Sequence, residues 1–496
     1  MNTGGASVDA RASRIARVPG LRMTRWMVAG LAGGAAALLV TTSALADPLV
    51  SESFTHSTVS DPNFHIGGSN FTPCLTAGTN TSQTPVPGCA LGTPDSDGAG
   101  TFRITDANLQ EAGFILFNRA QPFTAGLTVD FDFFMYGGST PPADGISFFL
   151  VDGATDLTKP GQPGGSLGYS TFGGMPGVNN GFLGVGLDEF GNFERDFFSG
   201  TGCTPTANVS GPNSVGIRGP GNGTAGYCLL ATNSSLPGAL HGGSIRSGAL
   251  RRAHIVVDPS NLASPHVTLS IDFGSGLQQL LQTALPPNPP ATYKFGFAGS
   301  TGSFTDVHEI RNLVSSTQQQ LPQLALQKTH SGSFTAGGSG TFLISASISG
   351  SGGTERTPVT VNDPLPSGLT VASPPSGSGW DCSATVVGST SASCTTAASQ
   401  TAPIAAGTTL PLLSVPVSVA QNAPATETNV ATVTSTDASN APVSASDTVA
   451  IAPAAAVPES PATTLLPIFG VLGGLLIGAP VLRTRRDRRR LGANVR

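Results

Sequence analysis

The feature that most restricts the fold of this chain is an alternation of apolar and polar residues with a period of two. It is clearest over residues 127–136 and returns over residues 267–273 and 293–297. Because successive side chains of a β-strand point to opposite faces, each segment would place one apolar face on a core. The chain also contains 64 glycines and 39 prolines, and long helical periodicity is absent. The sequence therefore predicts an all-β fold of stacked antiparallel sheets joined by turns.

A chain of 496 residues is long enough for two or three domains with cores of their own. The pattern predicts a first β domain over residues 47–314 and a second, smaller β-sandwich over residues 325–452, where charged residues are scarce. Between them, residues 315–324 are polar, contain turn residues and show no periodicity, which is typical of a linker.

Both ends of the chain are predicted to be targeting segments. Residues 1–46 combine arginines, an apolar run and small residues before Asp47, which predicts a signal peptide and export. Residues 464–482 carry no charge and precede a basic tail, residues 483–496. Their length is sufficient for a single transmembrane helix, with the tail in the cytoplasm and the exported part outside. A buried apolar strand is the alternative interpretation.

The formal net charge of −5 hides an uneven distribution, because arginines concentrate in the two terminal segments and leave the middle more acidic. Nucleic acid is therefore not an expected partner.

Ala and Pro dominate residues 453–463, which predicts an extended neck before the apolar segment.

The six cysteines form three local pairs, and export makes disulfide bonds the expected state. Fifteen connectivities are possible for six cysteines. We favour the sequential one, because each pair closes a loop rich in Gly, Ser and Thr within one expected domain. Metal-binding thiols are the weaker alternative, because no C-x-x-C spacing occurs. The predicted disulfides join Cys74 to Cys89, Cys203 to Cys228, and Cys382 to Cys394.

A candidate metal loop lies between Gly186 and Asp196. Within nine residues it offers the side-chain oxygens of Asp188, Asn192 and Asp196, with the backbone of Phe190 between them. Calcium takes about 6 to 8 oxygen ligands from carboxylates, amides, backbone carbonyls and water. The spacing therefore predicts a calcium site; a solvated turn is the alternative.

An acidic turn, Ala143-Asp144-Gly145, precedes an apolar strand some forty residues before this loop. Together the turn and the loop resemble the L-type (legume-like) lectins, and the resemblance covers most of residues 51–314. It implies a concanavalin-like jelly-roll β-sandwich, a carbohydrate-binding site and a cis peptide bond before Asp144. A plain acidic turn is the alternative for Asp144.

The resemblance also implies which residues contact the sugar. Asp144 would accept hydrogen bonds from it, a Gly-rich stretch would supply a backbone N–H at Gly165, and Asn192 would serve metal and sugar together. A late loop would complete the pocket with Thr301, Gly302, Ser303 and Phe304. Gly165 could equally belong to a hairpin turn, and Phe304 could equally belong to the core.

Two positions depart from the plant members of this family, which carry a transition-metal site. Gly186 and Ser214 stand where that site needs a glutamate and a histidine, so its loss is expected. His308 is similar to a strand histidine of the family and is interpreted as structural.

The second β segment resembles the conserved repeat domain of bacterial surface proteins, which implies an immunoglobulin-like stalk module. The matching segments are Lys328–Thr335, Asp363–Thr370, Gly379-Trp380 with Cys382, and Asn429–Val433. Residues 457–462 resemble the C-terminal sorting signals of exported bacterial proteins.

The sequence therefore predicts a calcium-dependent lectin or adhesin on a bacterial cell surface, with glycans as partners and no enzymatic activity. A structural surface or matrix protein with a non-binding lectin fold is the first alternative. A jelly-roll glycoside hydrolase is the second; it needs two carboxylates facing one cleft, whereas the adjacent Asp188 and Glu189 would point to opposite faces of a strand.

Overall fold

The structure is a computed structural model that describes residues 46–90, 93–206, 211–261 and 263–455. Within these ranges the chain is all-β, with four single-turn 3-10 helices: η1 (Phe123–Ala125), η2 (Gly164–Ser166), η3 (Asp196–Phe198) and η4 (Arg246–Gly248). Most of the signal peptide and neck, and all of the transmembrane helix and basic tail predicted from the sequence, lie outside the described residues. None of the helices in the described part is long and apolar enough to span a bilayer.

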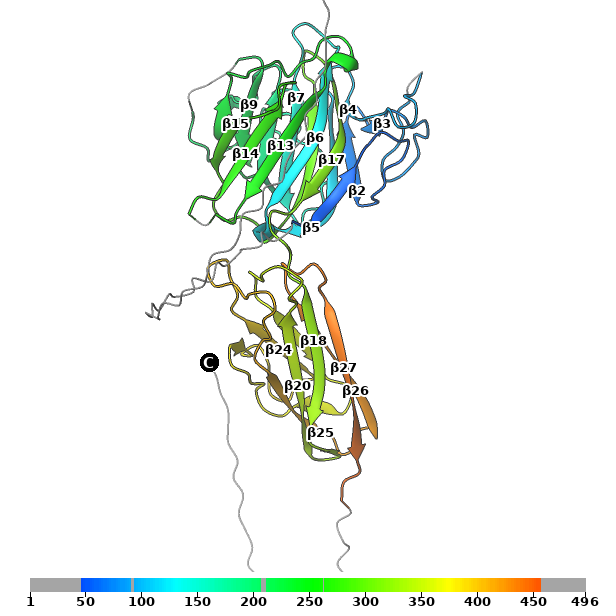
Figure 1. Ribbon diagram of the computed structural model, residues 1–496, viewed down its shortest axis with the longest axis vertical. Coiled ribbons are helices and arrows are strands. Elements are labelled where there is room, and N and C mark those ends of the chain that lie inside the picture. The colour runs from blue at the N-terminus through cyan, green and yellow to red at the C-terminus, as the bar shows by residue number, and fades with distance from the viewer. Residues whose placement is uncertain (1–45, 91–92, 207–210, 262, 456–496) are drawn as a thin grey trace, which may run out of the picture. The chain divides into compact units, whose positions relative to one another are not determined.

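The strands between Pro48 and Ser316 form two antiparallel sheets (Figure 1). The eight-stranded sheet has the order β15 (Leu277–Ala284), β14 (His266–Asp272), β13 (Arg251–Asp258), β6 (Leu127–Tyr136), β17 (Val307–Ser316), β4 (Phe102–Thr105), β3 (Cys74–Leu75), with β1 (Pro48–Glu52) also paired to β17. The nine-stranded sheet has the order β11 (Ala225–Gly226), β10 (Gly221–Asn222), β8 (Gly181–Asp188), β7 (Gly145–Asp152), β16 (Thr292–Ser300), β5 (Ala112–Pro122), β2 (Phe64–Ser69), with β9 (Ser214–Arg218) paired to β8 and to β12 (Leu229–Asn233).

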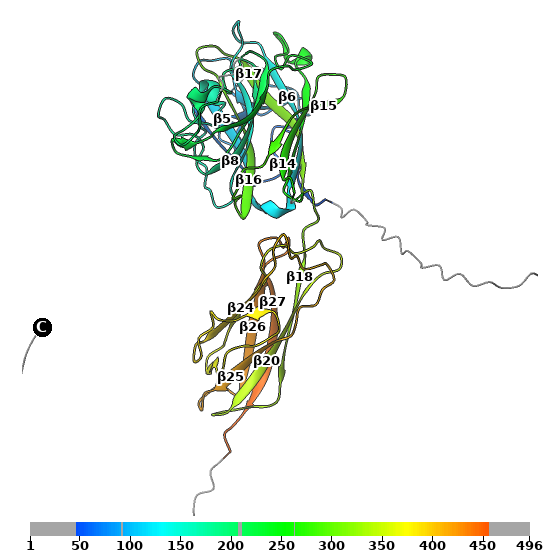
Figure 2. The ribbon, with the colours of Figure 1, turned by 90° about the vertical axis from the view of Figure 1, so that its left-hand side faces the viewer.

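The two sheets form separate layers, with β5, β8 and β16 in one and β6, β14 and β15 in the other (Figure 2). Their facing sides bury a continuous apolar core. Phe131 of β6 and Phe297 of β16 meet across it edge to face, with ring centroids 4.7 Å apart. The alternation seen over residues 127–136 thus places its apolar face against the other sheet. Each fully buried Phe contributes about 1.5–3 kcal/mol to folding.

A second apolar cluster covers the outer face of the nine-stranded sheet. Phe149 of β7 packs there with Tyr169, which comes from the loop between β7 and β8, and Tyr169 contacts Tyr227 edge to face. Since both faces of β7 are covered, its sequence Gly145–Asp152 contains the uninterrupted apolar run Phe148–Val151 and does not alternate. The long loops that cover this face also carry the candidate functional residues.

The strands between Leu324 and Ala452 form two further sheets around their own core. The orders are β18 (Leu324–Ser331), β20 (Ser339–Ile348), β25 (Leu413–Val419), β22 (Leu369–Val371), and β19 (Phe334–Thr335), β27 (Val443–Ala452), β26 (Thr426–Thr434), β21 (Thr360–Pro364), β24 (Ser391–Thr396), β23 (Trp380–Asp381). In the expected linker, residues 315 and 316 extend β17 and residue 324 begins β18, so residues 317–323 form the connection without strand structure.

Three motif residues of this second β unit meet inside it. Lys328 Nζ lies 2.7 Å from Asp363 Oδ2 and 4.5 Å from the centroid of the Phe342 ring. Asn429 Nδ2 donates to the same Asp363 oxygen at 3.3 Å. Burial lowers the pKa of Lys328, although the charge of Asp363 opposes this effect. The unit is therefore built around a buried ion pair.

All three predicted disulfides are present, Cys74–Cys89, Cys203–Cys228 and Cys382–Cys394, and the described residues contain no free cysteine. The alternative of metal-binding thiols is therefore excluded. Each bridge closes a short local loop and is worth about 2–4 kcal/mol by the chain-entropy argument.

Candidate functional site

A cavity of about 430 Å³ opens at one end of the nine-stranded sheet, and we call it the Asp144 cavity. The strand register explains its position: Gly145, the first residue of β7, pairs with Asp188 at the end of β8 and with Ser300 at the end of β16. The loops attached to these three strand ends therefore emerge side by side. Most of the predicted sugar contacts line the cavity, namely Asp144, Gly165, Asn192, Gly302, Ser303 and Phe304.

Asp144 lines this cavity and is only 3% exposed. Its peptide bond to Ala143 is cis, as the family resemblance implies. Asn192 Nδ2 donates to its Oδ1 at 3.4 Å, while its buried Oδ2 accepts no hydrogen bond within the described structure. Burial raises the pKa of Asp144 to about 7, with the hydrogen bond from Asn192 opposing the rise and the charge of Glu189 adding to it. A buried acceptor without a donor is rare in folded proteins and indicates a missing partner.

Two glycines permit the close packing around these polar groups. A Cβ atom on Gly165 would lie 2.2 Å from Asn192 Oδ1, and one on Gly302 would lie 2.9 Å from Asp144 Oδ2. Gly165 lies in the 3-10 turn η2 rather than in a β-hairpin. Both positions therefore need glycine because the backbone approaches the side chains that line the cavity.

Aromatic rings form the cavity wall. Phe304 is 36% exposed and stacks on Phe190, with ring centroids 5.6 Å apart, so Phe304 is not a core residue. On another side Phe172 packs against Phe197 and Phe198, and Phe197 is 62% exposed. The last three residues were not predicted from the sequence, because an isolated Phe in a loop has no local signal that distinguishes a wall from a core.

The predicted metal loop is ordered around Asp188, which is fully buried. Gly191 N–H donates to Asp188 Oδ1 at 2.7 Å, and Phe193 N–H donates to Oδ2 at 2.5 Å. Burial and the neighbouring carboxylate of Glu194 raise the pKa of Asp188 well above its usual range, against these two hydrogen bonds. The buried Asn192 Oδ1 has no hydrogen-bond partner among the described residues.

Glu194 belongs to the same buried cluster, although it was not predicted. Ser214 Oγ donates to Glu194 Oε2 at 3.0 Å, while the buried Oε1 has no partner in the described structure. Ser214 thus takes part in a hydrogen bond at the position where the plant lectins have a metal-binding histidine. A Cβ on Gly186 would lie 2.5 Å from the Phe193 ring, so a glutamate there would not fit without rearrangement. The buried oxygens of Asp188, Asn192 and Glu194 are a donor set that suits a hard cation such as calcium.

Two predicted residues lie elsewhere. Asp196 begins η3, and its Oδ1 accepts hydrogen bonds from Thr206 N–H at 3.0 Å and Thr206 Oγ at 2.9 Å. Thr301 is buried behind the cavity, where its hydroxyl donates to Asn108 O at 2.6 Å and accepts from Glu111 N–H at 3.0 Å. Thr301 therefore anchors the loop that carries Gly302 and Phe304, and is not one of the residues that line the cavity.

A second polar cluster, which we call the Glu189 cluster, consists of Glu189, His241 and Asp306. Glu189 points away from the metal loop, as expected for a residue adjacent to Asp188. Its Oε1 lies 3.1 Å from His308 Nε2, and its Oε2 lies 3.3 Å from His241 Nδ1. His241 Nδ1 also lies 2.8 Å from Asp306 Oδ2. Although burial acts in the opposite direction, the nearby imidazoles of His241 and His308 lower the pKa of Glu189.

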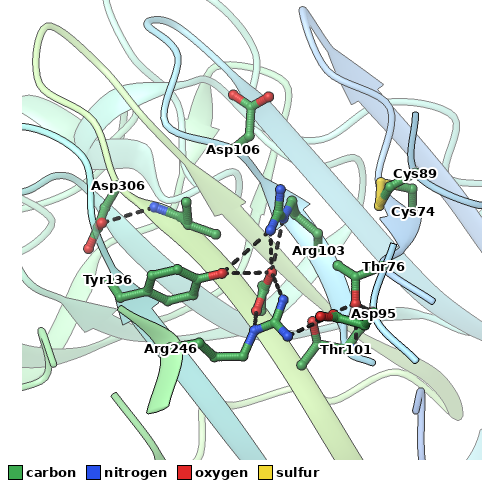
Figure 3. A network of polar contacts seen from close by, with 12 residues as sticks. Cys74, Thr76, Cys89, Asp95, Thr101, Arg103, Asp106, Tyr136, Arg246 and Asp306 are labelled. Carbon is green, nitrogen blue, oxygen red and sulfur yellow. Dashed lines mark hydrogen bonds and ion pairs between the residues drawn. A yellow bond between two sulfur atoms is a disulfide. The ribbon is translucent and has the colours of Figure 1, made fainter. Parts of the chain in front are cut away.

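The other face of β17 carries an arginine network (Figure 3). Glu309 accepts hydrogen bonds from Arg103 Nε at 2.9 Å and from Arg246 Nε at 2.6 Å, and Tyr136 OH donates to it at 3.2 Å. Arg246 also pairs with Asp95 at 2.7 Å. Because His308 and Glu309 are consecutive strand residues, the arginines and the Glu189 cluster lie on opposite faces of β17.

No family model matches the sequence, and no match was found among curated proteins. Among solved structures, the chain is similar to peanut lectin, with 18% identity, 54% of this chain and 97% of that chain covered, and a TM-score of 0.35. It is also similar to the metal-free lectin I-B4 from Griffonia simplicifolia, with 18% identity, coverage of 54% and 99%, and a TM-score of 0.37.

A third similar structure is the exoplasmic/lumenal domain of VIP36 bound to Ca²⁺ and Man3GlcNAc, with 16% identity, coverage of 52% and 86%, and a TM-score of 0.33. Because these TM-scores are low, we infer the architecture of this chain from its own sheets and its function from its own side chains.

Proposed function

We propose that residues 47–314 form a lectin domain that binds a saccharide in the Asp144 cavity. The observation that carries this proposal is the buried, partnerless Oδ2 of Asp144 in a cavity with an aromatic wall. Saccharides present hydroxyl donors together with apolar C–H patches. A carboxylate oxygen acceptor beside exposed Phe304 matches both features.

The residues around the cavity would divide the work of binding. Asp144 would accept one or two sugar hydroxyls, and the Gly165 N–H would donate to a sugar oxygen. Phe304 would pack against a C–H face of the ring. Asn192 would hold Asp144 in place through the 3.4 Å contact with its Oδ1. Because Gly165 and Gly302 have no side chains, a ring could come close to the backbone.

We further propose that calcium binds at Asp188 and Asn192, with Glu194 as an additional oxygen donor and the backbone of Phe190 nearby. The bound ion would offset the buried negative charge and keep the loop ordered. The buried, partnerless Asn192 Oδ1 and Glu194 Oε1 support this assignment. A loop ordered before binding lowers the entropic cost of capturing a sugar. Asp196 is retained as a predicted ligand, although its Oδ1 already accepts two hydrogen bonds from Thr206.

In this proposal the protein is exported, anchored by residues 464–482, and acts in adhesion as a cell-surface lectin without enzymatic activity. A single shallow site of this kind binds weakly; a millimolar dissociation constant corresponds to about −4 kcal/mol. Many copies on one surface would raise the avidity for a glycan-coated partner.

The test is a glycan array probed with the full-length protein in calcium and in chelator. We expect retention on a subset of glycans in calcium and loss of that retention in Asp144→Ala. Asp97→Ala is the matched control, because the Asp97 side chain is 72% exposed and pairs with His56, which does not line the cavity. If the folded wild-type protein binds no glycan in calcium, the protein is a structural surface protein and the proposal is wrong.

A further inference from the structure

The Glu189 cluster has the arrangement of a metal centre that is separate from the predicted calcium loop. Its members come from three distant places: Glu189 follows β8, His241 precedes η4, and Asp306 precedes β17. One potential ligand atom from each lies within 4.8 Å of the other two. Glu189 and Asp306 are almost fully buried, while the His241 side chain is 27% exposed.

Each carboxylate has one oxygen held by the protein and one oxygen facing His241. Glu189 Oε1 lies 3.1 Å from His308 Nε2, and Asp306 Oδ1 accepts the Val307 N–H at 3.0 Å. His308 is in turn fixed by Thr105, whose Oγ lies 2.6 Å from Nδ1. If Thr105 donates to Nδ1, then Nε2 carries the hydrogen that Glu189 accepts. Such outer contacts orient the ligands of metal sites.

The two carboxylate oxygens that face His241, Glu189 Oε2 and Asp306 Oδ2, have too few hydrogen-bond donors between them. His241 Nδ1 carries at most one hydrogen, and Asp306 Oδ2 at 2.8 Å is the nearer acceptor. Glu189 Oε2, at 3.3 Å from the same nitrogen, has no hydrogen-bond partner in the described structure although it is buried. No lysine or arginine of the described residues pairs with Glu189 or Asp306; Arg103 and Arg246 instead pair with Glu309.

The spacing of these atoms suits a transition metal. Ligands bonded at about 2.0–2.2 Å lie about 3.0–3.5 Å apart around an octahedral or tetrahedral ion. The distances from His241 Nδ1 to Asp306 Oδ2 and to Glu189 Oε2, 2.8 and 3.3 Å, are close to that range. A divalent cation would neutralise the two buried carboxylates of Glu189 and Asp306.

The cluster also borders a cavity. A space of about 410 Å³ lies between Pro141, Pro142 and Pro212, and Glu189 and His241 are the charged or titratable groups that line it. Three protein ligands leave coordination positions open for water or a small ligand. In this cluster, His241 is the ligand that faces the cavity and solvent.

From this geometry we propose that Glu189, His241 and Asp306 bind one divalent transition-metal ion, with zinc as the reference, and that its open positions face the proline-lined cavity. The mixed set of one imidazole and two carboxylates favours such ions over calcium, which takes oxygen ligands. The calcium loop and this centre would then be occupied by different ions.

The test measures zinc binding to the chelator-treated full-length protein by calorimetry and by metal analysis after desalting. Excess calcium is present throughout, so that the oxygen-only loop is filled. We expect one zinc ion per chain in the wild type and at least about tenfold weaker binding in His241→Gln, in line with the effect of altering a metal-site contact. His56→Gln is the matched control, since that side chain is 56% exposed and pairs with Asp97, which is not a member of the Glu189 cluster.

Asp306→Asn is the second variant, and it should lose zinc in the same way. Because Asp306 is buried, the folding of this variant is checked by circular dichroism; if it fails to fold, His241→Gln decides. A wild-type protein that is folded but takes up no zinc overturns the proposal, and so does unchanged zinc affinity in His241→Gln. Glycan binding is measured separately, so that failure of this centre is distinguishable from failure of the lectin site.

Discussion

Substituting Gly165 by Ala tests whether backbone proximity shapes the Asp144 cavity. The added Cβ would lie 2.2 Å from Asn192 Oδ1 and 2.6 Å from Phe198 Cζ, both well inside van der Waals contact. No positive φ is involved at this position, so the cost comes from the contacts alone. We expect the Asn192 side chain to move, because it is only partly buried while the backbone of η2 is packed.

The movement would remove the 3.4 Å contact between Asn192 Nδ2 and Asp144 Oδ1. It would also disturb the orientation of Asp144 toward a ligand. A hydrogen bond to a charged group is worth about 1.5–3 kcal/mol. At about 1.4 kcal/mol per decade, glycan affinity should fall by about 10- to 100-fold.

The assay is titration of wild type and Gly165→Ala with a glycan that the wild type retains, together with thermal unfolding of both proteins. Gly350→Ala is the matched control, because a Cβ there meets nothing closer than 3.9 Å and the residue lies in the second β unit. Unchanged glycan affinity in Gly165→Ala would refute the argument that this glycine is required by Asn192. A large loss of stability with no separate loss of affinity would refute it as well.

Three further predictions concern stability. Lys328→Met should destabilise the second β unit by about 3–5 kcal/mol in urea unfolding, because it leaves Asp363 buried without its partner; replacing both residues with apolar ones should cost much less. The hydrogen bond to Asp130 raises the pKa of His254. The stability that this pair provides is therefore fully present below the unfolded-state pKa of about 6.5, and it is lost as pH rises through the folded-state pKa. Since the pair is partly exposed, His254→Gln should lose only about 0.2–1 kcal/mol at pH 5.5 and almost nothing at pH 8.5, measured by unfolding at both pH values. Calcium at 100 times its dissociation constant should stabilise the first β unit by about 2.7 kcal/mol, seen as a higher unfolding temperature that chelator reverses; an unfolding temperature independent of calcium would contradict the assignment of the Asp188 loop.

The regular part of the fold was predictable because its signals are local. Alternation over residues 127–136 identified a strand with one buried face, and the cysteine pairs were close enough in sequence for sequential pairing to be a reasonable prediction. Within the predicted linker, residues 315 and 316 pair with β6 although they resemble turn residues, because strand pairing depends on a partner that is distant in sequence.

The grouping of residues around the candidate site could be predicted only from a family resemblance. Asp144, Gly165 and Asn192 line one cavity, while their roles in binding stay a prediction. Thr301 belongs to the loop that carries Gly302 and Phe304, but its hydroxyl bonds to backbone groups, and no sequence pattern shows the direction of a hydroxyl. His241 and Asp306 are 65 residues apart and meet Glu189 only through the folding of loops on two sheets. The prediction that His308 is structural agrees with its contacts to Thr105 and Glu189, which hold other groups in place.

Phe190 borders both the proposed sugar site and the cavity beside the proposed transition-metal centre. This residue lines both the Asp144 cavity and the proline-lined cavity, and it follows Glu189 directly in the sequence. An occupant of one cavity that shifts Phe190 would therefore change the shape of the other. By thermodynamic reciprocity, the factor by which the first occupant alters the affinity for the second equals the factor in the reverse direction. If both proposed sites are occupied, sugar affinity and metal affinity would therefore be linked through one residue.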